Sequence, residues 1–171
     1  LYGKTLGHYR ALDIQKKFPL LYENSYTFGF VRDPMERLYS AYNFAKKGQT
    51  ESMGVVNPAQ YCTPEFESFE SFVLGWLKDK DVNALDNIFK EQSYYLCDNN
   101  RNIIVDDFYF LDNLDSNIGK VSKKLGKNLD VIKKNVSNKN GYCKKDLYSK
   151  EMEEIAMNIY KKDYDVFFNG V

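Results

Sequence analysis

The sequence is poor in the residues that most often carry metal and disulfide chemistry. Its 171 residues include one histidine and three cysteines, and Cys62, Cys97 and Cys143 are widely spaced. An odd, scattered set of cysteines argues against a disulfide framework and makes no metal-binding signature, so we expect free thiols and no metal. Acidic and basic residues balance at 24 each. A net charge of zero provides no bulk field for nucleic acid or an anionic membrane, and we expect neither as a partner.

Long apolar runs are also missing. No stretch reaches the length of a membrane span, and no signal peptide is recognisable. The chain begins at Leu1 rather than at methionine, so we expect it to be N-terminally incomplete or processed. Its length is that of one domain with a single core, and we predict a single domain over residues 1–171.

Arginine is scarce, and two of the four arginines fall in one segment, YTFGFVRDPMERLYSAYNF at residues 26–44. The residues up to Val31 predict a buried strand. Asp33 can cap a helix, Pro34 suits its first position, and helical spacing follows. Because the first N–H groups of a helix are unpaired and its dipole is positive there, this step is a natural anion site. The alternative is an ordinary capped core helix with surface arginines.

Within this segment, FVRDPMERLYSAY resembles the 3′-phosphate motif of the sulfotransferases that use PAPS (3′-phosphoadenosine 5′-phosphosulfate). In that motif an arginine ends a strand and a serine follows eight residues later. The pattern is most similar to the Golgi carbohydrate O-sulfotransferases, including the heparan 2-O-type enzymes. The resemblance implies that Arg32 and Ser40 bind the 3′-phosphate. An arginine fork suits this task, since it grips phosphate bidentately.

The start of the chain departs from that family. Gly3-Lys4-Thr5 has no apolar strand before it, so we expect a solvated loop rather than a phosphate loop. The family's 5′-phosphosulfate loop is therefore expected to be absent, and Lys4 is the only lysine near the place of the catalytic one. His8 and the helix predicted over residues 9–18 resemble the 2-O-sulfotransferases, in which a histidine here is the proposed base. Imidazole suits that role. The alternative is a structural histidine, because other members use a carboxylate.

Further contacts follow from the resemblance alone. In the family, the loop after the 3′-phosphate helix borders the acceptor cleft, so Lys46 and Lys47 are candidates to meet an anionic sugar or the donor. A solvated charge pair is the alternative. Gln92 matches a Gln-Ser pair beside the acceptor cleft. An Asn-x-Ser segment and a lysine near the nucleotide make three more residues candidate donor contacts: Asn135, Ser137 and Lys139.

The remaining elements are read from periodicity. Apolar spacing predicts helices over residues 66–78 and 83–96, and a β-branched run predicts a strand at residues 103–105. A helix from about Asp112 should stop at Gly126. Ser149 should cap the last helix, which runs to about Tyr164.

Strands alternating with helices predict an α/β protein with a small parallel sheet flanked by several helices. The resemblance adds a P-loop-like sulfotransferase fold and the transfer of a sulfuryl group from PAPS to a carbohydrate hydroxyl, with a nucleotide donor and a carbohydrate acceptor as partners. The alternatives are a non-catalytic relative that binds nucleotide or glycan, a P-loop small-molecule kinase, and a helical interaction domain. A composition rich in lysine and asparagine favours a microbial, cytoplasmic protein. The Golgi lumen, where the family's membrane-associated animal members act, is the alternative.

Overall fold

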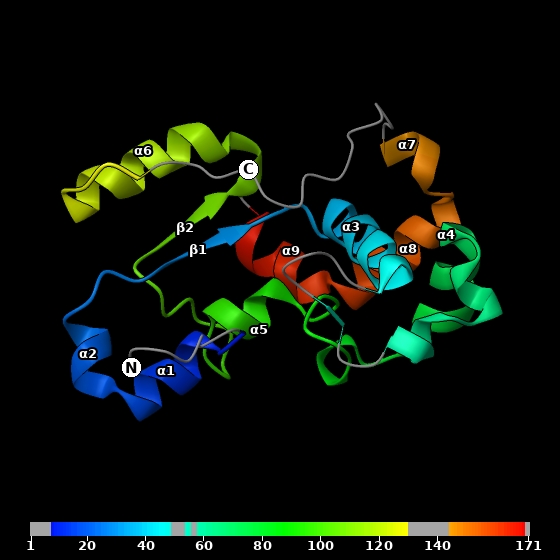
Figure 1. Cartoon of the computed structure of the whole chain (residues 1–171), viewed down its shortest axis with the longest axis horizontal. Coiled ribbons are helices and arrows are strands. Elements are labelled where there is room, and N and C mark those ends of the chain that lie inside the picture. The colour runs from blue at the N-terminus through cyan, green and yellow to red at the C-terminus, as the bar shows by residue number, and fades with distance from the viewer. Residues whose placement is uncertain (1–7, 49–53, 56–57, 130–143, 170–171) are drawn as a thin grey trace. The chain divides into compact units, whose positions relative to one another are not determined.

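The structure is a computed structural model that describes residues 8–48, 54–55, 58–129 and 144–169 (Figure 1). Residue contacts divide the chain into two compact units. The first unit comprises Leu1–Arg32, Glu91–Ile132 and Val166–Val171, and the second comprises Asp33–Lys90 and Lys133–Asp165. The single-domain organisation stays a prediction. Four candidate site residues lie outside the described residues: Lys4, Asn135, Ser137 and Lys139.

The first unit contains the parallel sheet that the sequence predicts. Strands β1 (Phe28–Val31) and β2 (Asp107–Phe110) lie side by side (Figure 1), and their register runs from Phe28 opposite Asp107 to Val31 opposite Phe110. The prediction of a strand at residues 103–105 is wrong. Ile103 instead forms an isolated antiparallel bridge with Cys97, and the sheet uses the aromatic run that follows.

The packing of phenylalanines explains why the strand begins later than predicted. Val31 is fully buried and packs with Phe108 and Phe110 of β2 in the apolar core of this unit. The register is fixed just before the sheet, where the Thr27 N–H donates to Asp106 Oδ2 at 2.7 Å and the Asp106 N–H donates to Thr27 O at 3.0 Å. A β-prone run is therefore left outside the strand, because burial of side chains decides strand position more strongly than propensity.

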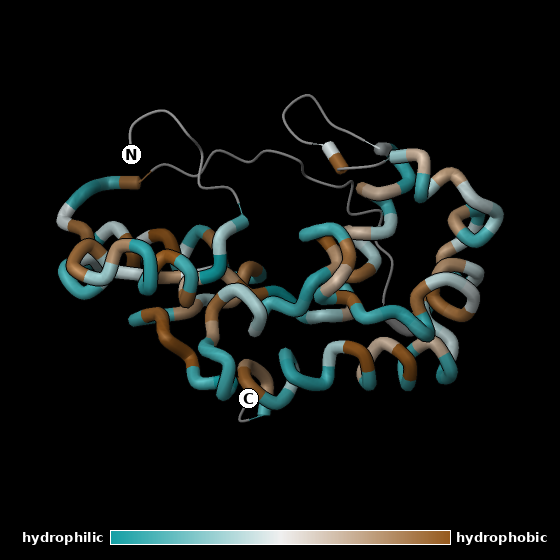
Figure 2. The backbone as a smooth tube through the Cα atoms, turned by 90° about the horizontal axis from the view of Figure 1, so that it is seen from below, coloured by the Kyte–Doolittle hydropathy of each residue, from teal (hydrophilic) through white to brown (hydrophobic). Residues whose placement is uncertain are grey.

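The described part of the first unit also contains four helices. They are α1 (Ala11–Lys17), α2 (Pro19–Glu23), α5 (Gln92–Leu96) and α6 (Leu114–Leu125). Helix α6 packs against β2, and α1 packs against α2 and α5. Helix α6 stops at Gly126, whose φ of 63° is the left-handed conformation that favours glycine at a helix end. That boundary confirms the prediction from the sequence. Figure 2 shows hydrophilic and hydrophobic residues alternating along the helical turns, as expected for helices with one buried face.

The second unit is helical. Its main helices are α3 (Pro34–Lys47), α4 (Phe69–Ser71), α7 (Lys144–Leu147), α8 (Lys150–Ile159) and α9 (Lys161–Phe167), the last of which ends in the first unit. Short 3₁₀ turns η1, η2 and η4 lie at Pro58–Tyr61, Pro64–Phe66 and Val82–Ala84, and η3 (Phe72–Leu77) is a π-helix. Ser149 caps α8 by accepting a hydrogen bond from the Met152 N–H, as predicted. That helix ends earlier than predicted, at Ile159.

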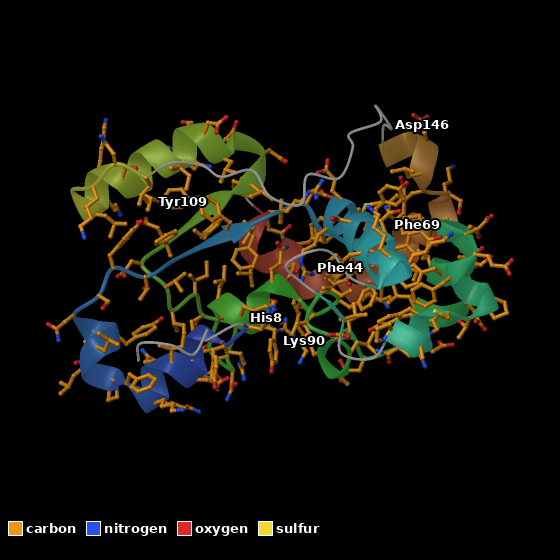
Figure 3. The ribbon with its side chains drawn as sticks, viewed as in Figure 1. His8, Phe44, Phe69, Lys90, Tyr109 and Asp146 are labelled. Atoms are coloured by element: carbon orange, nitrogen blue, oxygen red, sulfur yellow. The ribbon has the colours of Figure 1, made fainter. Side chains whose placement is uncertain are left out.

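Aromatic rings fill the core of the second unit. Phe72 is fully buried, and its ring lies 5.2 Å from that of Tyr42 and 5.0 Å from that of Phe66. Phe69, labelled in Figure 3, makes edge contacts at 5.0 Å with Tyr39 and Tyr148. The helix predicted over residues 83–96 is wrong in its middle: helical structure stops after Val82–Ala84 and resumes only at Gln92. Between them, buried Phe89 is held by a tertiary hydrogen bond from Tyr160.

Candidate functional site

The candidate site begins where β1 ends. Val31 is the last residue of the strand and is fully buried, whereas Arg32 is partly exposed. Asp33 follows as the N-cap of α3, with Pro34 at the first helical position. The strand-arginine-cap-helix order predicted from the sequence is thereby confirmed. The carboxyl ends of parallel strands are where α/β proteins commonly bind ligands.

A buried glutamine holds the backbone of the candidate arginine. The Arg32 N–H donates to Gln92 Oε1 at 2.8 Å, and Gln92 Nε2 donates to the Arg32 carbonyl oxygen, also at 2.8 Å. Gln92 is the first residue of α5 and is 7% exposed. The backbone conformation at Arg32 is thus fixed by two charge-neutral hydrogen bonds from one side chain. Whether Gln92 also contacts an acceptor, as the resemblance implies, stays a prediction.

The start of α3 is already capped by a carboxylate. Asp33 Oδ1 accepts hydrogen bonds from the Met35 and Glu36 N–H groups at 3.0 and 3.1 Å. The expectation that these first-turn groups are unpaired is therefore wrong, since the cap satisfies two of them. A phosphate near this helix would meet a negative side chain at the cap. The Asp33 cap therefore leaves fewer backbone donors for an anion at this end of the helix.

A buried tyrosine of the second unit, Tyr148, binds the first turn of α3. The Tyr148 hydroxyl donates to the Met35 carbonyl oxygen at 2.7 Å and is buried. Burial raises the pKa of Tyr148 above its ordinary value, and the charges of neighbouring tyrosines and of Asp33 raise it further. The hydroxyl therefore remains a protonated donor across the physiological pH range, and the helix start is held rigidly.

Ser40 and Arg37, two further polar residues of the motif, lie on α3. Ser40 is half-buried two turns into the helix. Arg37 Nη2 donates to the Asn87 carbonyl oxygen at 3.5 Å, a long bond, and Arg37 is also half-buried. The roles proposed for Arg32 and Ser40 in phosphate binding stay predictions.

His8 is the first described residue and precedes α1 (Figure 3). It is exposed and has a φ of 66°, a left-handed conformation that is uncommon outside glycine but enriched in histidine, asparagine and aspartate. An exposed imidazole is accessible to substrate, and its role as a base stays a prediction.

The two lysines expected near the acceptor lie at the end of α3. Lys46 and Lys47 are both exposed. Lys46 Nζ donates to the Glu67 carbonyl oxygen at 3.0 Å and lies 5.7 Å from the centre of the Tyr42 ring. One lysine thus helps to fasten the loop after α3, while Lys47 extends from the last turn.

A polar cluster that no sequence pattern predicts lies at the opposite end of the sheet. Tyr26 donates to Asp107 Oδ2 at 2.5 Å, its hydroxyl lies 2.9 Å from that of Tyr109, and Lys124 forms an ion pair with Asp107. The hydrogen bond from Lys124 and that from Tyr26 lower the pKa of Asp107. Burial and the hydrogen bond to Asp107 raise the pKa of Tyr26. The ion pair links α6 to the start of the sheet, and periodicity gives no sign of a pairing across 17 residues.

No group of three or more histidine, cysteine, aspartate or glutamate side chains in the described part of the chain is arranged to hold a metal ion. None of the helices described combines the length and the apolar composition that crossing a membrane requires.

Comparison with protein families decides the broad assignment. The model of a family described as the sulfotransferase family matches residues 2–169. The chain belongs to the sulfotransferase family. The mixed α/β structure, with its small parallel sheet flanked by helices, agrees with the fold of this family. Comparisons with curated proteins and with solved structures gave no match. Membership in the sulfotransferase family supports sulfuryl transfer as the chemistry, with a nucleotide donor and an acceptor substrate as partners.

Proposed function

We propose that this sulfotransferase-family protein moves a sulfuryl group from PAPS to a carbohydrate hydroxyl. The observation that carries the proposal is the step from β1 into α3. There, Arg32 follows the carboxyl end of a parallel strand, and Gln92 binds its backbone at both the N–H and the C=O. A guanidinium group on a fixed backbone is suited to bidentate recognition of a phosphate.

In this proposal the 3′-phosphate of the donor is bound by side chains. Arg32 supplies the charge, and the Ser40 hydroxyl supplies a further donor. Asp33 already occupies the Met35 and Glu36 N–H groups of α3. Further donor contacts are proposed for three residues outside the described part of the chain: Asn135, Ser137 and Lys139.

The reaction is an in-line displacement at sulfur. The acceptor hydroxyl oxygen forms a new S–O bond, the S–O bond to the 5′-phosphate of the donor breaks, and PAP (3′-phosphoadenosine 5′-phosphate) leaves with the bonding electrons. His8 takes the proton of the attacking hydroxyl. A cationic group beside the bridging oxygen would stabilise the charge that develops on PAP, and Lys4 is the candidate from the sequence.

The acceptor is proposed to be anionic or polar and to meet the segment that ends α3. Lys46 and Lys47 are exposed there, so either ammonium group is accessible to a sulfated or carboxylated sugar. Gln92 is the further acceptor contact implied by the family resemblance.

The decisive experiment is calorimetric titration of PAP into the wild-type protein and into Arg32→Glu. Exposed Arg101 offers a matched charge reversal, Arg101→Glu, in the same unit of the structure. We expect PAP to bind the wild-type and Arg101→Glu proteins, and binding to Arg32→Glu to be lost. PAP binding to Arg32→Glu with wild-type affinity would overturn the proposed site.

Turnover distinguishes the reaction from simple nucleotide binding. PAPS labelled at sulfur should pass its label to an oligosaccharide acceptor from a panel of neutral and anionic glycans. Binding of PAP without transfer to any glycan would favour a non-catalytic member of the family. Transfer of phosphate from ATP instead would favour the kinase alternative.

A further inference from the structure

Both strands of the parallel sheet end against a buried carboxamide. Gln92 binds the N–H and the C=O of Arg32, the residue that follows β1. Asn117 of α6 donates from Nδ2 to the carbonyl oxygen of Phe110, the last residue of β2, at 2.8 Å. Gln92 is 7% exposed and Asn117 is 5% exposed. Asparagine and glutamine are rarely buried to this extent unless their polar groups are bonded.

The two carboxamides do different things to the backbone. Asn117 satisfies one carbonyl group, whereas Gln92 satisfies both backbone groups of Arg32 and so takes the place of a neighbouring strand. Two bonds from one planar group restrict the φ and ψ angles of Arg32. Those angles set the direction in which its side chain leaves the strand end.

The two hydrogen bonds between Gln92 and Arg32 lie where the chain leaves the first unit and where it returns to it. The chain leaves the first unit after Arg32 and returns at Glu91, one residue before Gln92. Gln92 therefore joins, within the first unit, the point of exit to the point of return. Phe167, next to the second return at Val166, is 3% exposed and packs in the same small core as Val31. Within the first unit, Phe167 therefore packs beside the last residue of β1.

We propose that Gln92 is a positioning residue for the 3′-phosphate: it fixes the backbone of Arg32 so that the guanidinium meets the phosphate in a bidentate geometry. This inference rests on the proposed function and assigns Gln92 a role on the donor side of the site. The physical reason is that a fork-to-phosphate contact is directional, and small displacements of a positioned group cost affinity steeply.

The main test compares Gln92→Leu with Asn117→Leu. Each substitution removes a buried carboxamide that holds the backbone at a strand end, but only Gln92 touches Arg32. Calorimetry would measure the affinity for PAP and for 5′-AMP, which lacks the 3′-phosphate. We expect Gln92→Leu to reduce the preference for PAP over 5′-AMP by about tenfold, a change of about 1.4 kcal/mol. Asn117→Leu should leave that preference at the wild-type value.

A double-mutant cycle tests whether Gln92 acts through Arg32. If it does, the effect of Gln92→Leu on PAP affinity should vanish in an Arg32→Ala background. Equal effects of Gln92→Leu in both backgrounds would overturn the proposal. Should Gln92→Leu fail to fold, Gln92→Glu serves in its place. That variant keeps an acceptor for the Arg32 N–H but loses the donor to the Arg32 carbonyl, so its PAP preference should also fall.

A readout without ligand separates this inference from the proposed function. Hydrogen exchange of the Arg32 amide should accelerate in Gln92→Leu and not in Asn117→Leu. An unchanged exchange rate of the Arg32 amide in Gln92→Leu would overturn the claim that Gln92 holds the Arg32 backbone. If Arg32→Ala weakens PAP binding while Gln92→Leu does not, the positioning role fails and the proposed function stands. If the wild-type protein does not distinguish PAP from 5′-AMP, the proposed function fails and the positioning role fails with it.

Discussion

The hydroxyl of Tyr160 donates a hydrogen bond of 2.8 Å to the carbonyl oxygen of Phe89, 71 residues away in sequence. Tyr160 is 1% exposed and Phe89 is fully buried. The bond crosses the core of the second unit and holds the stretch where periodicity predicts a helix and the structure has none. A buried carbonyl that is bonded by a side chain needs no partner from a helical turn.

Tyr160→Phe should therefore destabilise the protein. The ring is kept, but the carbonyl of Phe89 is left buried without its donor, which costs about 1–3 kcal/mol. The measurement is the free energy of unfolding in urea. Tyr39→Phe is the matched control, because the Tyr39 hydroxyl makes no hydrogen bond among the described residues. If Tyr160→Phe lowers the free energy of unfolding no more than Tyr39→Phe does, the hydrogen bond from Tyr160 to Phe89 contributes nothing to stability.

Gly29→Ala in β1 is predicted to be destabilising. A Cβ atom at Gly29 would lie 2.6 Å from Cδ2 and 2.8 Å from Cδ1 of Leu96. We expect Gly29→Ala to cost about 1–3 kcal/mol in unfolding free energy, because Leu96 must leave its packed position. In a Leu96→Ala background the clash is gone, so the cost of Gly29→Ala should fall by about 1 kcal/mol. Additive effects in the double variant would contradict the steric explanation.

Gly119 in α6 is predicted to behave in the opposite way. A Cβ atom there meets nothing within 4 Å, and the residue is exposed in the middle of the helix. Gly119→Ala should stabilise the protein by about 0.5–1 kcal/mol, since alanine loses less backbone entropy on folding. Thermal and urea unfolding of Gly119→Ala against the wild type would measure this gain. A destabilised Gly119→Ala variant would show that the helix face is covered.

The ion pair between Asp107 and Lys124 should make stability pH-dependent. The pKa of Asp107 is lowered in the folded protein, chiefly by the hydrogen bond from Lys124. The stabilisation of the folded state by ionised Asp107 is therefore present above its unfolded pKa of about 3.9. It is lost as the pH falls through the lower pKa of the folded protein. At neutral pH, the Lys124→Met variant should unfold at a lower urea concentration than the wild-type protein. The difference should shrink as the pH falls below about 4.

The control for that titration is Lys123→Met. Lys123 is an exposed neighbour on α6 and makes no ion pair with the described residues. The offset between wild type and Lys123→Met should stay constant across the same pH range. An identical pH dependence for the two variants would mean that the loss of one lysine charge, rather than the pair with Asp107, causes the effect.

His8→Asn tests the proposed base. Asparagine tolerates the left-handed conformation at this position but cannot accept the hydroxyl proton. We expect turnover to fall by about 10²–10⁴-fold while PAP affinity is unchanged, as for the loss of a general base. Tyr9→Phe, at the next exposed residue, should leave turnover intact. Wild-type turnover by His8→Asn would leave His8 as a structural residue.

The ends of several helices could be predicted from the sequence, because capping residues act within a single turn. Asp33 and Pro34 specify the start of α3, Gly126 specifies the end of α6, and Ser149 specifies the start of α8. Each signal acts through the backbone of its own turn, so nothing distant can override it cheaply. Two predictions were wrong, the strand at residues 103–105 and the continuous helix over residues 83–96. In both segments burial, which depends on distant partners, competes with local propensity.

The sequence by itself determined the family motif, the order of strand, arginine, cap and helix, and the presence of a small parallel sheet. Tertiary structure alone decided that Gln92 holds the backbone of Arg32 and that Lys124 pairs with Asp107. The reason is physical. Motifs and caps are encoded within a few residues, whereas a hydrogen bond between residues 60 positions apart exists only after the chain has packed its core.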